Sequence, residues 1–243
     1  MFNILKENIQ DYFIGQSTIE KDKLVANILL NFPELKESSI NVYLSLLKKE
    51  GVIQNPSRGI YALEEMNSYI PTIDIKQKRL FRKIKKDLPF IDFCIWNTKW
   101  LNEFMLHQPF KYYTVLEIEK DAIEPVFYLL KEQGKPVFLE PDADTFDLYI
   151  NNSEDVIILK QLITESPLQE IENILIPTLE KLLVDMTIDT NLYSAQQGEI
   201  KLIFTSAFEK YTVNKNRMKR YSYRRNRENE IEKLTNLTLA NIA

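Results

Sequence analysis

Residues 33–63 follow the order of a helix, a glycine stop, a strand, a turn and a return strand. A serine, Ser38 or Ser39, is expected to cap the start of the helix, and Gly51 is expected to end it in the left-handed conformation. The helix carries apolar residues at the i, i+3, i+4, i+7 spacing of one buried face, which are Ile40, Tyr43, Leu44 and Leu47. This combination is typical of the recognition helix and wing of a winged helix-turn-helix.

The rest of the N-terminal part agrees with that prediction. A strand is expected from residue 52, turn chemistry fills residues 55–59, and a return strand is expected over residues 60–63. Apolar periodicity predicts two further helices, over residues 1–15 and 21–30. Three helices followed by a two-stranded wing therefore make a winged helix-turn-helix over residues 1–66.

The open faces of the predicted recognition helix carry short polar side chains and lysines. Hydroxyls and amides near the start of such a helix can reach base edges, and lysines suit phosphates. Arg58, at the wing tip, is expected at the minor groove or the DNA backbone. Winged helices also serve as protein-docking modules, so that alternative stays open. The predicted DNA-binding residues are Ser39, Asn41, Ser45, Lys48, Lys49 and Arg58.

Composition narrows the class of protein. The 243 residues can form one to three compact units, and a hydrophobic content of 44% argues against disorder. Cys94 is the single cysteine, which excludes an internal disulfide, and its apolar neighbours predict a buried thiol. The N-terminus lacks the apolar segment of a signal peptide, and no apolar run is long enough to span a membrane. We therefore expect a soluble, cytoplasmic protein without a membrane partner.

The charge distribution affects the DNA-binding prediction. Residues 1–66 contain seven Lys or Arg and nine Asp or Glu, whereas non-specific DNA affinity comes mostly from neutralising phosphates. DNA binding by this part is therefore expected to need a homodimer or basic surface elsewhere in the chain. Two stretches offer such surface, because residues 76–86 hold seven basic residues and no acid, and residues 210–227 hold eight and no acid.

The middle of the chain alternates between strand and helix patterns. A basic amphipathic helix is expected over residues 75–86, a short helix over residues 100–106, and a helix over residues 121–133 that starts at Asp121 and ends at Gly134. This alternation predicts an α/β unit with a mixed sheet over about residues 76–165. The expected strands are residues 90–96, 112–118, 135–139, 146–150 and 156–163.

The last third, residues 166–243, is predicted to be helical. Helices are expected over residues 168–186 with an interruption at Pro177, around residues 207–211, and over residues 214–234. The predicted class of the whole chain is α+β. It consists of the winged helix-turn-helix and a second part over residues 67–243, whose α/β core precedes this helical portion.

Arginines and aromatics alternate in the last predicted helix. Four arginines at spacings of three, four and three gather on one side, and such surfaces stack on bases, clamp phosphates or bind acidic protein partners. Internal pairing with carboxylates such as Glu180 or Asp185 is the competing interpretation. The predicted partner- or nucleic-acid-binding residues are Arg217, Arg220, Tyr223, Arg224 and Arg227.

No motif in the sequence predicts a catalytic site, a metal site or a cofactor. His107 is the only histidine, and there is no glycine-rich phosphate loop. The enzymatic alternative is a metal-dependent nuclease, since Asp147 and Lys160 fall in predicted neighbouring strands as in restriction-endonuclease-type sites. Ile158 stands where that arrangement needs a second acid, so no catalytic residue is predicted.

Three segments resemble the AbiEi-type antitoxins of bacterial abortive-infection, or type IV toxin-antitoxin, systems. They are LLKKEGVI followed by RGIYAL at the predicted wing, IPTLEKLLVDM, and KYTVNKNRMKRYSYRR near the end, while the middle of the chain matches only by order of elements.

The resemblance implies a two-part antitoxin. Its winged helix would bind operator DNA and repress its own operon, through Ser39, Asn41, Ser45, Lys49 and Arg58 by position. The remainder would oppose a nucleotidyltransferase-type toxin encoded beside it, without a stable complex. A stand-alone regulator and a protein-docking effector are the alternatives.

Overall fold

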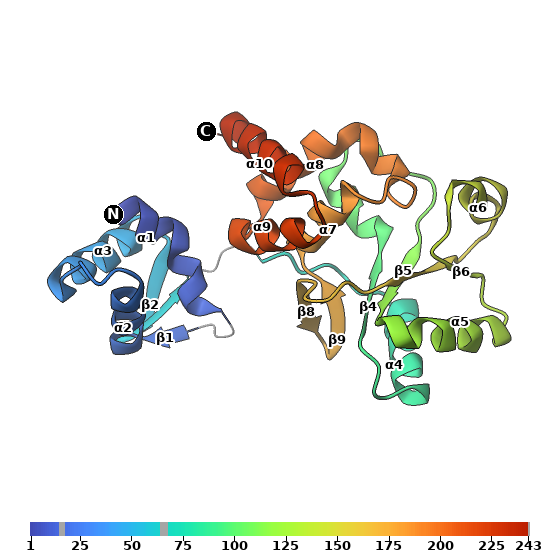
Figure 1. The fold of residues 1–243 in the computed structure, drawn as a ribbon, viewed down its shortest axis with the longest axis horizontal. Coiled ribbons are helices and arrows are strands. Elements are labelled where there is room, and N and C mark those ends of the chain that lie inside the picture. The colour runs from blue at the N-terminus through green and yellow to red at the C-terminus, as the bar shows by residue number, and fades with distance from the viewer. Residues whose placement is uncertain (15–17, 64–67, 243) are drawn as a thin grey trace. The chain divides into compact units, whose positions relative to one another are not determined.

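The structure, a computed structural model, describes residues 1–14, 18–63 and 68–242. The chain forms two compact units, Met1–Ser68 and Tyr69–Ala243, whose elements are labelled in Figure 1. The predicted domain boundary after residue 66 and the predicted helix end at Gly15 lie outside the described residues. No helix in the described ranges is both long and apolar enough to cross a membrane.

The first unit combines helices with a small antiparallel sheet in the strand order β1-β3-β2. The strand β1 was not predicted from the sequence, and the predicted first helix is a short α-helix followed by a tighter 3₁₀ turn. The elements are α1 (Phe2–Asn8), η1 (Ile9–Phe13), β1 (Thr18–Glu20), α2 (Lys21–Asn31), α3 (Glu37–Lys49), β2 (Ile53–Ser57) and β3 (Ile60–Leu63).

Helix α3 buries the face that its spacing predicts, with Ile40, Leu44 and Leu47 in the core of the first unit. Its start differs from the prediction, because Lys36 is the N-cap residue and no side chain caps the helix. Ser38 and Ser39 lie inside the first turn instead. Gly51 has a φ of 70°, which confirms the left-handed stop.

The second unit is built on a four-stranded sheet of order β4-β5-β7-β6. Strands β5, β7 and β6 are parallel and β4 is antiparallel to β5, which confirms a mixed sheet in an α+β chain. The elements up to the end of this sheet are α4 (Ile75–Asp87), β4 (Phe93–Asn97), η2 (Thr98–Phe104), β5 (Thr114–Ile118), η3 (Lys120–Ala122), α5 (Ile123–Glu132), β6 (Val137–Leu139), α6 (Ala143–Leu148), η4 (Ile150–Asn152) and β7 (Ile157–Gln161).

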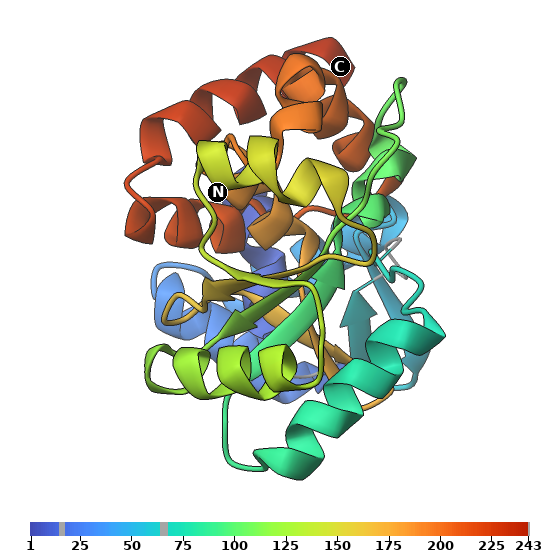
Figure 2. The same ribbon diagram turned by 90° about the vertical axis from the view of Figure 1, so that its right-hand side faces the viewer.

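The two crossovers between parallel strands place their helices on opposite faces of this sheet. The chain passes from β5 through α5 to β6 and returns through α6 to β7, which lies between them. Two right-handed crossovers that run in opposite directions must use opposite faces. Figure 2 shows α5 and α4 on one face and α6 on the other, together with the C-terminal helices.

The remaining elements are mostly helical. Helix α7 packs on the sheet face opposite α4 and α5, and every residue in it is buried. The elements are β8 (Leu168–Ile171), β9 (Ile174–Pro177), α7 (Leu179–Met186), η5 (Ser194–Glu199), α8 (Ile200–Lys210), α9 (Lys215–Arg224) and α10 (Glu228–Ile242).

Two predicted elements have the opposite secondary structure. Residues 146–150, predicted as a strand, lie in α6 and η4. The Asp142 side chain caps α6 by accepting the backbone N–H of Thr145, and Phe146 and Ile150 point inward at helical spacing. Residues 168–177, predicted as helix, form the β8–β9 hairpin.

Several predicted boundaries move as well. The strand predicted from residue 90 begins at Phe93, because Phe90 is 96% exposed. Asp121 lies in η3, so it is not the cap of α5, although Gly134 follows that helix with a φ of 68°. The single helix predicted over residues 214–234 is divided into α9 and α10 at Asn226, whose φ is 55°.

Candidate functional site

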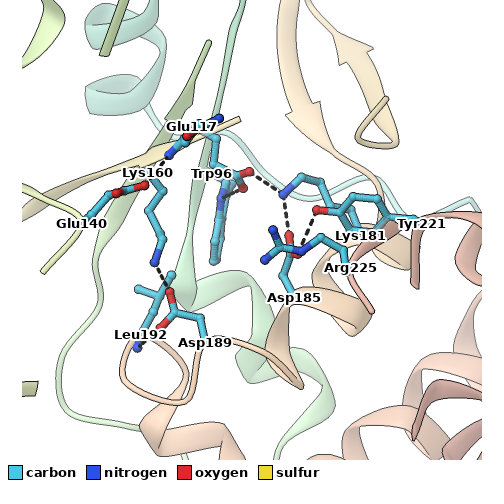
Figure 3. A network of polar contacts seen from close by, with 11 residues as sticks. Trp96, Glu117, Glu140, Lys160, Lys181, Asp185, Asp189, Leu192, Tyr221 and Arg225 are labelled. Atoms are coloured by element: carbon cyan, nitrogen blue, oxygen red, sulfur yellow. Dashed lines mark hydrogen bonds and ion pairs between the residues drawn. The ribbon is translucent and has the colours of Figure 1, made fainter. Parts of the chain in front are cut away.

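A network of charged side chains lies near the carboxyl ends of β5 and β7 (Figure 3). These strands are adjacent and parallel, and their register places Glu117 of β5 beside Lys160 of β7. Helix α7 covers this face and adds Lys181 and Asp185 one turn apart. Cys94 of β4, which is paired with Glu117 in the sheet, is fully buried as predicted.

Lys181 is the centre of the network. Its ammonium group is fully buried and donates hydrogen bonds to Glu117 Oε2 and Asp185 Oδ2, both at 2.5 Å. The other carboxylate oxygen of Glu117 accepts a 2.9 Å hydrogen bond from Trp96 Nε1. A buried cation between two carboxylates is balanced only while all three groups are present.

Helix α9 and the residue that follows it contribute two further side chains to the network. Asp185 Oδ1 accepts a hydrogen bond from the Tyr221 hydroxyl at 2.9 Å and lies 3.4 Å from Arg225 Nε. One turn away, Glu180 Oε1 accepts the backbone N–H of Asn214 at 2.8 Å. The carboxylates of α7 therefore fix the position of α9 and of the residues around its ends.

The environment keeps Lys181 and two buried tyrosines in one protonation state near neutral pH. Burial by itself would lower the pKa of Lys181, but the carboxylates of Asp185 and Glu117 hold that pKa well above its usual value. Burial, followed by the charge of Asp185, raises the pKa of Tyr221 and of Tyr193. Lys181 is therefore a fixed charge at neutral pH, and both tyrosines remain neutral.

A second, more accessible pair lies beside this network. Lys160 forms an ion pair with Asp189, whose other oxygen accepts the backbone N–H of Leu192 at 3.0 Å. Glu140 Oε1 accepts the backbone N–H of Gln161 at 3.2 Å, and Glu140 has an unusual φ of 42°.

These groups line a cavity of about 250 Å³. Ligands of open α/β sheets bind at this end of the strands. The carboxylates of Glu117 and Asp185 already have partners, whereas the Arg225 side chain is 22% exposed and its guanidinium can donate hydrogen bonds to a ligand. The cavity could hold a small polar molecule with acceptor groups. Its other lining residues include Trp96, Glu140, Lys160, Asp189, Tyr193 and Tyr221.

The arginines predicted as a partner surface are mostly paired within the second unit. Arg217 Nη1 lies 3.7 Å from Glu180, Arg224 pairs with Glu165, and Arg227 Nε lies 3.8 Å from Glu230. The predicted single stripe is wrong, because Arg227 lies beyond the end of α9. Arg220 and Tyr223 are exposed, and within the described ranges neither has a polar partner.

The predicted DNA-binding residues lie on one helix and one hairpin of the first unit. On α3, Ser39 and Asn41 are half-buried, and Ser45, Lys48 and Lys49 are exposed. Arg58 is exposed between β2 and β3, where Gly59 has a φ of 77°.

The nuclease alternative fails on the placement of Asp147. This residue lies on the exposed face of α6 and accepts a hydrogen bond from Asn151, so it does not share neighbouring strands with Lys160. Among residues 1–14, 18–63 and 68–242, no three His, Cys, Asp or Glu side chains are grouped to hold a metal ion.

Sequence reasoning missed the buried network itself. Glu117 interrupts the apolar strand TVLEI, and Lys181 and Asp185 stand four residues apart in a helix that is otherwise mostly apolar. An ionisable residue in an apolar run signals a buried partner, because burying a charge alone is costly. That signal was available, but it does not name the partners.

The fold and this site define a two-unit α+β protein with a charged cavity at the end of its mixed sheet. A family described as a family of unknown function (DUF6577) matches residues 39–241, and the chain belongs to that family. The match begins within α3 and includes the whole charge network. No curated protein matches the chain.

Proposed function

We propose that the first unit is a winged helix-turn-helix that binds DNA, and that the chain is an antitoxin-type transcriptional regulator. It represses its own operon and opposes a nucleotidyltransferase-type toxin encoded beside it. The proposal assigns no chemical step, cofactor or metal to the chain.

The observation that carries the DNA-binding part is the arrangement of the first unit. Its order is helix, strand, helix, helix, strand, strand, and the sheet order is β1-β3-β2. In a winged helix-turn-helix the third helix enters the major groove and the last hairpin is the wing. Helix α3 and the β2–β3 hairpin have the same order in the chain, which supports the proposal.

The side chains on α3 support the same interpretation. Asn41, Ser45 and Lys49 recur every fourth residue, so they share one face of the helix, away from the buried Ile40 and Leu44. Asparagine can read adenine, and lysine can bind phosphate. Val42, which is 57% exposed, offers an apolar contact for a thymine methyl group.

Support for the antitoxin part comes from the two C-terminal segments that resemble the AbiEi-type group. In the structure they pack on each other, because Asp185 of the first segment contacts Tyr221 and Arg225 of the second. Two segments that form one charge network are expected to occur together in proteins that share this core.

DNA binding is tested with a duplex from the region upstream of the chain's own gene and a scrambled duplex of equal length. We expect Asn41→Ala to reduce the preference for the upstream duplex by about 5- to 100-fold, because a base contact is lost. Arg58→Ala should weaken binding to both duplexes. Lys6→Ala, a matched loss of one charge at a lysine paired with Glu50, should leave both affinities unchanged.

The outcome against DNA binding by this unit would be equal affinity of wild type, Asn41→Ala and Arg58→Ala for the upstream duplex. The antitoxin part is tested separately by co-expression with the neighbouring gene. We expect that gene alone to stop growth and the full chain to restore it, with Arg58→Ala still restoring growth. A harmless neighbour, or no rescue, contradicts the antitoxin part.

A further inference from the structure

Helix α4 presents a row of cations to solvent that the second unit does not neutralise. Arg79, Arg82 and Lys86 are exposed at the i, i+3, i+7 spacing of one face. Within the described part of the chain, none of the three has a hydrogen-bond or ion-pair partner. We call these three residues the α4 stripe.

The other four cations of this helix differ, because each has a partner. Lys83 pairs with Asp87 of the same helix at 3.3 Å, and the remaining three contact residues outside the helix. Lys76 pairs with Asp155 at 2.8 Å, and Lys78 pairs with Glu172 at 2.5 Å. Lys85 donates to the backbone carbonyl of Ile91 at 2.6 Å. Carboxylates therefore reach this helix on its flanks but not along the stripe.

Of the stripe, only Lys86 lies in the last turn of the helix, where a cation complements the helix dipole. Arg79 has Arg82 at i+3 and Lys83 at i+4, and Arg82 has Lys86 at i+4. Like charges at these spacings repel and destabilise a helix. The start of α4 is already fixed by a capping box between Asp74 and Gln77. The folded second unit therefore gives no structural reason for Arg79 and Arg82, which is the pattern of a surface for an anionic partner.

The partner that best fits is the phosphate backbone of duplex DNA. Seven residues of helix separate Arg79 from Lys86, or about 10 Å, and a DNA strand presents a phosphate about every 3.4 Å of axis. A membrane surface fits less well, because membrane-binding helices expose an apolar face. In α4 that face is buried, with Phe81 packed 4.6 Å from Phe93 between ring centres.

We propose that the α4 stripe binds duplex DNA phosphates without sequence preference and supplies the positive charge that residues 1–66 lack. This inference rests on the proposed function, because it adds backbone contacts to the same DNA complex. Two contact surfaces on one chain bind a duplex more tightly than either alone when both can engage it.

The test is the salt dependence of DNA binding by the full chain, measured by fluorescence anisotropy with the upstream duplex and its scrambled counterpart. The stripe variant is Arg79→Gln with Arg82→Gln. The control is Lys76→Gln with Lys78→Gln, which makes the same change in net charge on the same helix at paired positions.

We expect the stripe variant to bind both duplexes about tenfold or more weakly at low salt, with the slope of log K against log salt reduced by about 2. The control should change that slope by less than half as much. Circular dichroism should show both variants folded, and the stripe variant no less stable than wild type, because like-charge repulsion is removed.

Equal salt slopes for the stripe and control variants would overturn the inference, as would failure of the wild type to bind either duplex. Stripe-dependent binding to vesicles of anionic lipid, without duplex binding, would assign the stripe to a membrane instead. If the stripe effect appears but wild type shows no preference for the upstream duplex, the proposed operator recognition fails and this inference stands. If wild type prefers the upstream duplex and the stripe variant matches the control, this inference fails and the proposed operator recognition stands.

Discussion

Helices α4 and α9 both carry dense groups of basic side chains, but different numbers of carboxylates face them. On α9 and its C-terminal turn, Arg217, Arg224 and Arg225 meet Glu180, Glu165 and Asp185. On α4, Arg79, Arg82 and Lys86 face solvent. The α9 group fixes the packing of the second unit, whereas the α4 group has no ion-pair or hydrogen-bond partner among the described residues.

Charge density along the sequence therefore does not distinguish cations that are paired within the fold from cations that are exposed and unpaired. The carboxylates that neutralise α9 come from the segment before β8 and from α7, so they are about 35 to 60 residues away in the chain. Arg220 is the exception on α9, because it is exposed and lies between paired neighbours. Substitutions can test whether the two helices really differ in this way.

The largest expected effect is at Lys181, which bonds to Asp185, the carboxylate that contacts Tyr221 of α9. Lys181→Met leaves Glu117 and Asp185 buried without their shared cation, so the free energy of unfolding should fall by about 3–5 kcal/mol. Urea unfolding followed by tryptophan fluorescence measures this, since Trp96 and Trp100 both lie in the second unit.

Two further variants decide whether charge is the cause. Adding Glu117→Gln to Lys181→Met should recover part of the loss, because one unpaired buried charge is removed. Lys83→Met, at a half-exposed lysine paired with Asp87, should change the free energy by less than about 0.5 kcal/mol. Equal effects of the two lysine variants would show that the buried network does not stabilise the fold.

A smaller effect is expected at Arg225. Its side chain is 22% exposed beside Asp185, and Asp185 keeps Lys181 and Tyr221 as partners when Arg225 is truncated. Arg225→Ala should therefore cost about 1–2 kcal/mol by urea unfolding. Arg220→Ala, five positions earlier on an exposed face, should cost less than about 0.5 kcal/mol. If the two substitutions cost the same, α9 is as free as α4 and the comparison is wrong.

The sequence predicted the elements whose pattern is local. Helix α3 follows from its apolar spacing and Gly51, and strands β5 and β7 follow from their apolar runs. Each of these depends on residues within one turn or one strand, where periodicity is informative.

The sequence did not predict the features that depend on long-range contacts or on turn geometry. Residues 168–177 have no strong turn signal, yet Glu172 and Asn173 both adopt positive φ values of 52° and 62° and make a hairpin. The charge network was not predicted from the sequence for a related reason. Glu117, Lys181 and Tyr221 are separated by 64 and 40 residues (181 − 117 and 221 − 181), and no local pattern joins a strand, a helix and a second helix into one network.

The smallest expected effect is at Asn226, which separates α9 from α10. The Arg227 N–H bonds to the Ser222 carbonyl at 2.9 Å and the Asn226 N–H to the Tyr223 carbonyl at 3.1 Å. With Asn226 at a φ of 55°, these two bonds form a Schellman motif, which places a left-handed residue directly after the helix.

Two substitutions of Asn226 are expected to change the stability of the second unit in opposite directions. Asn226→Gly should stabilise the second unit by about 0.5 kcal/mol, and Asn226→Ala should destabilise it by about 1 kcal/mol, because alanine disfavours the left-handed region. A continuous helix over residues 214–234 requires the opposite order, since alanine is the best helix former and glycine among the poorest. Urea midpoints of the two variants rank them directly. If alanine is the more stable variant, α9 and α10 are one helix, and the placement of Arg225, on which the comparison with α4 depends, is wrong.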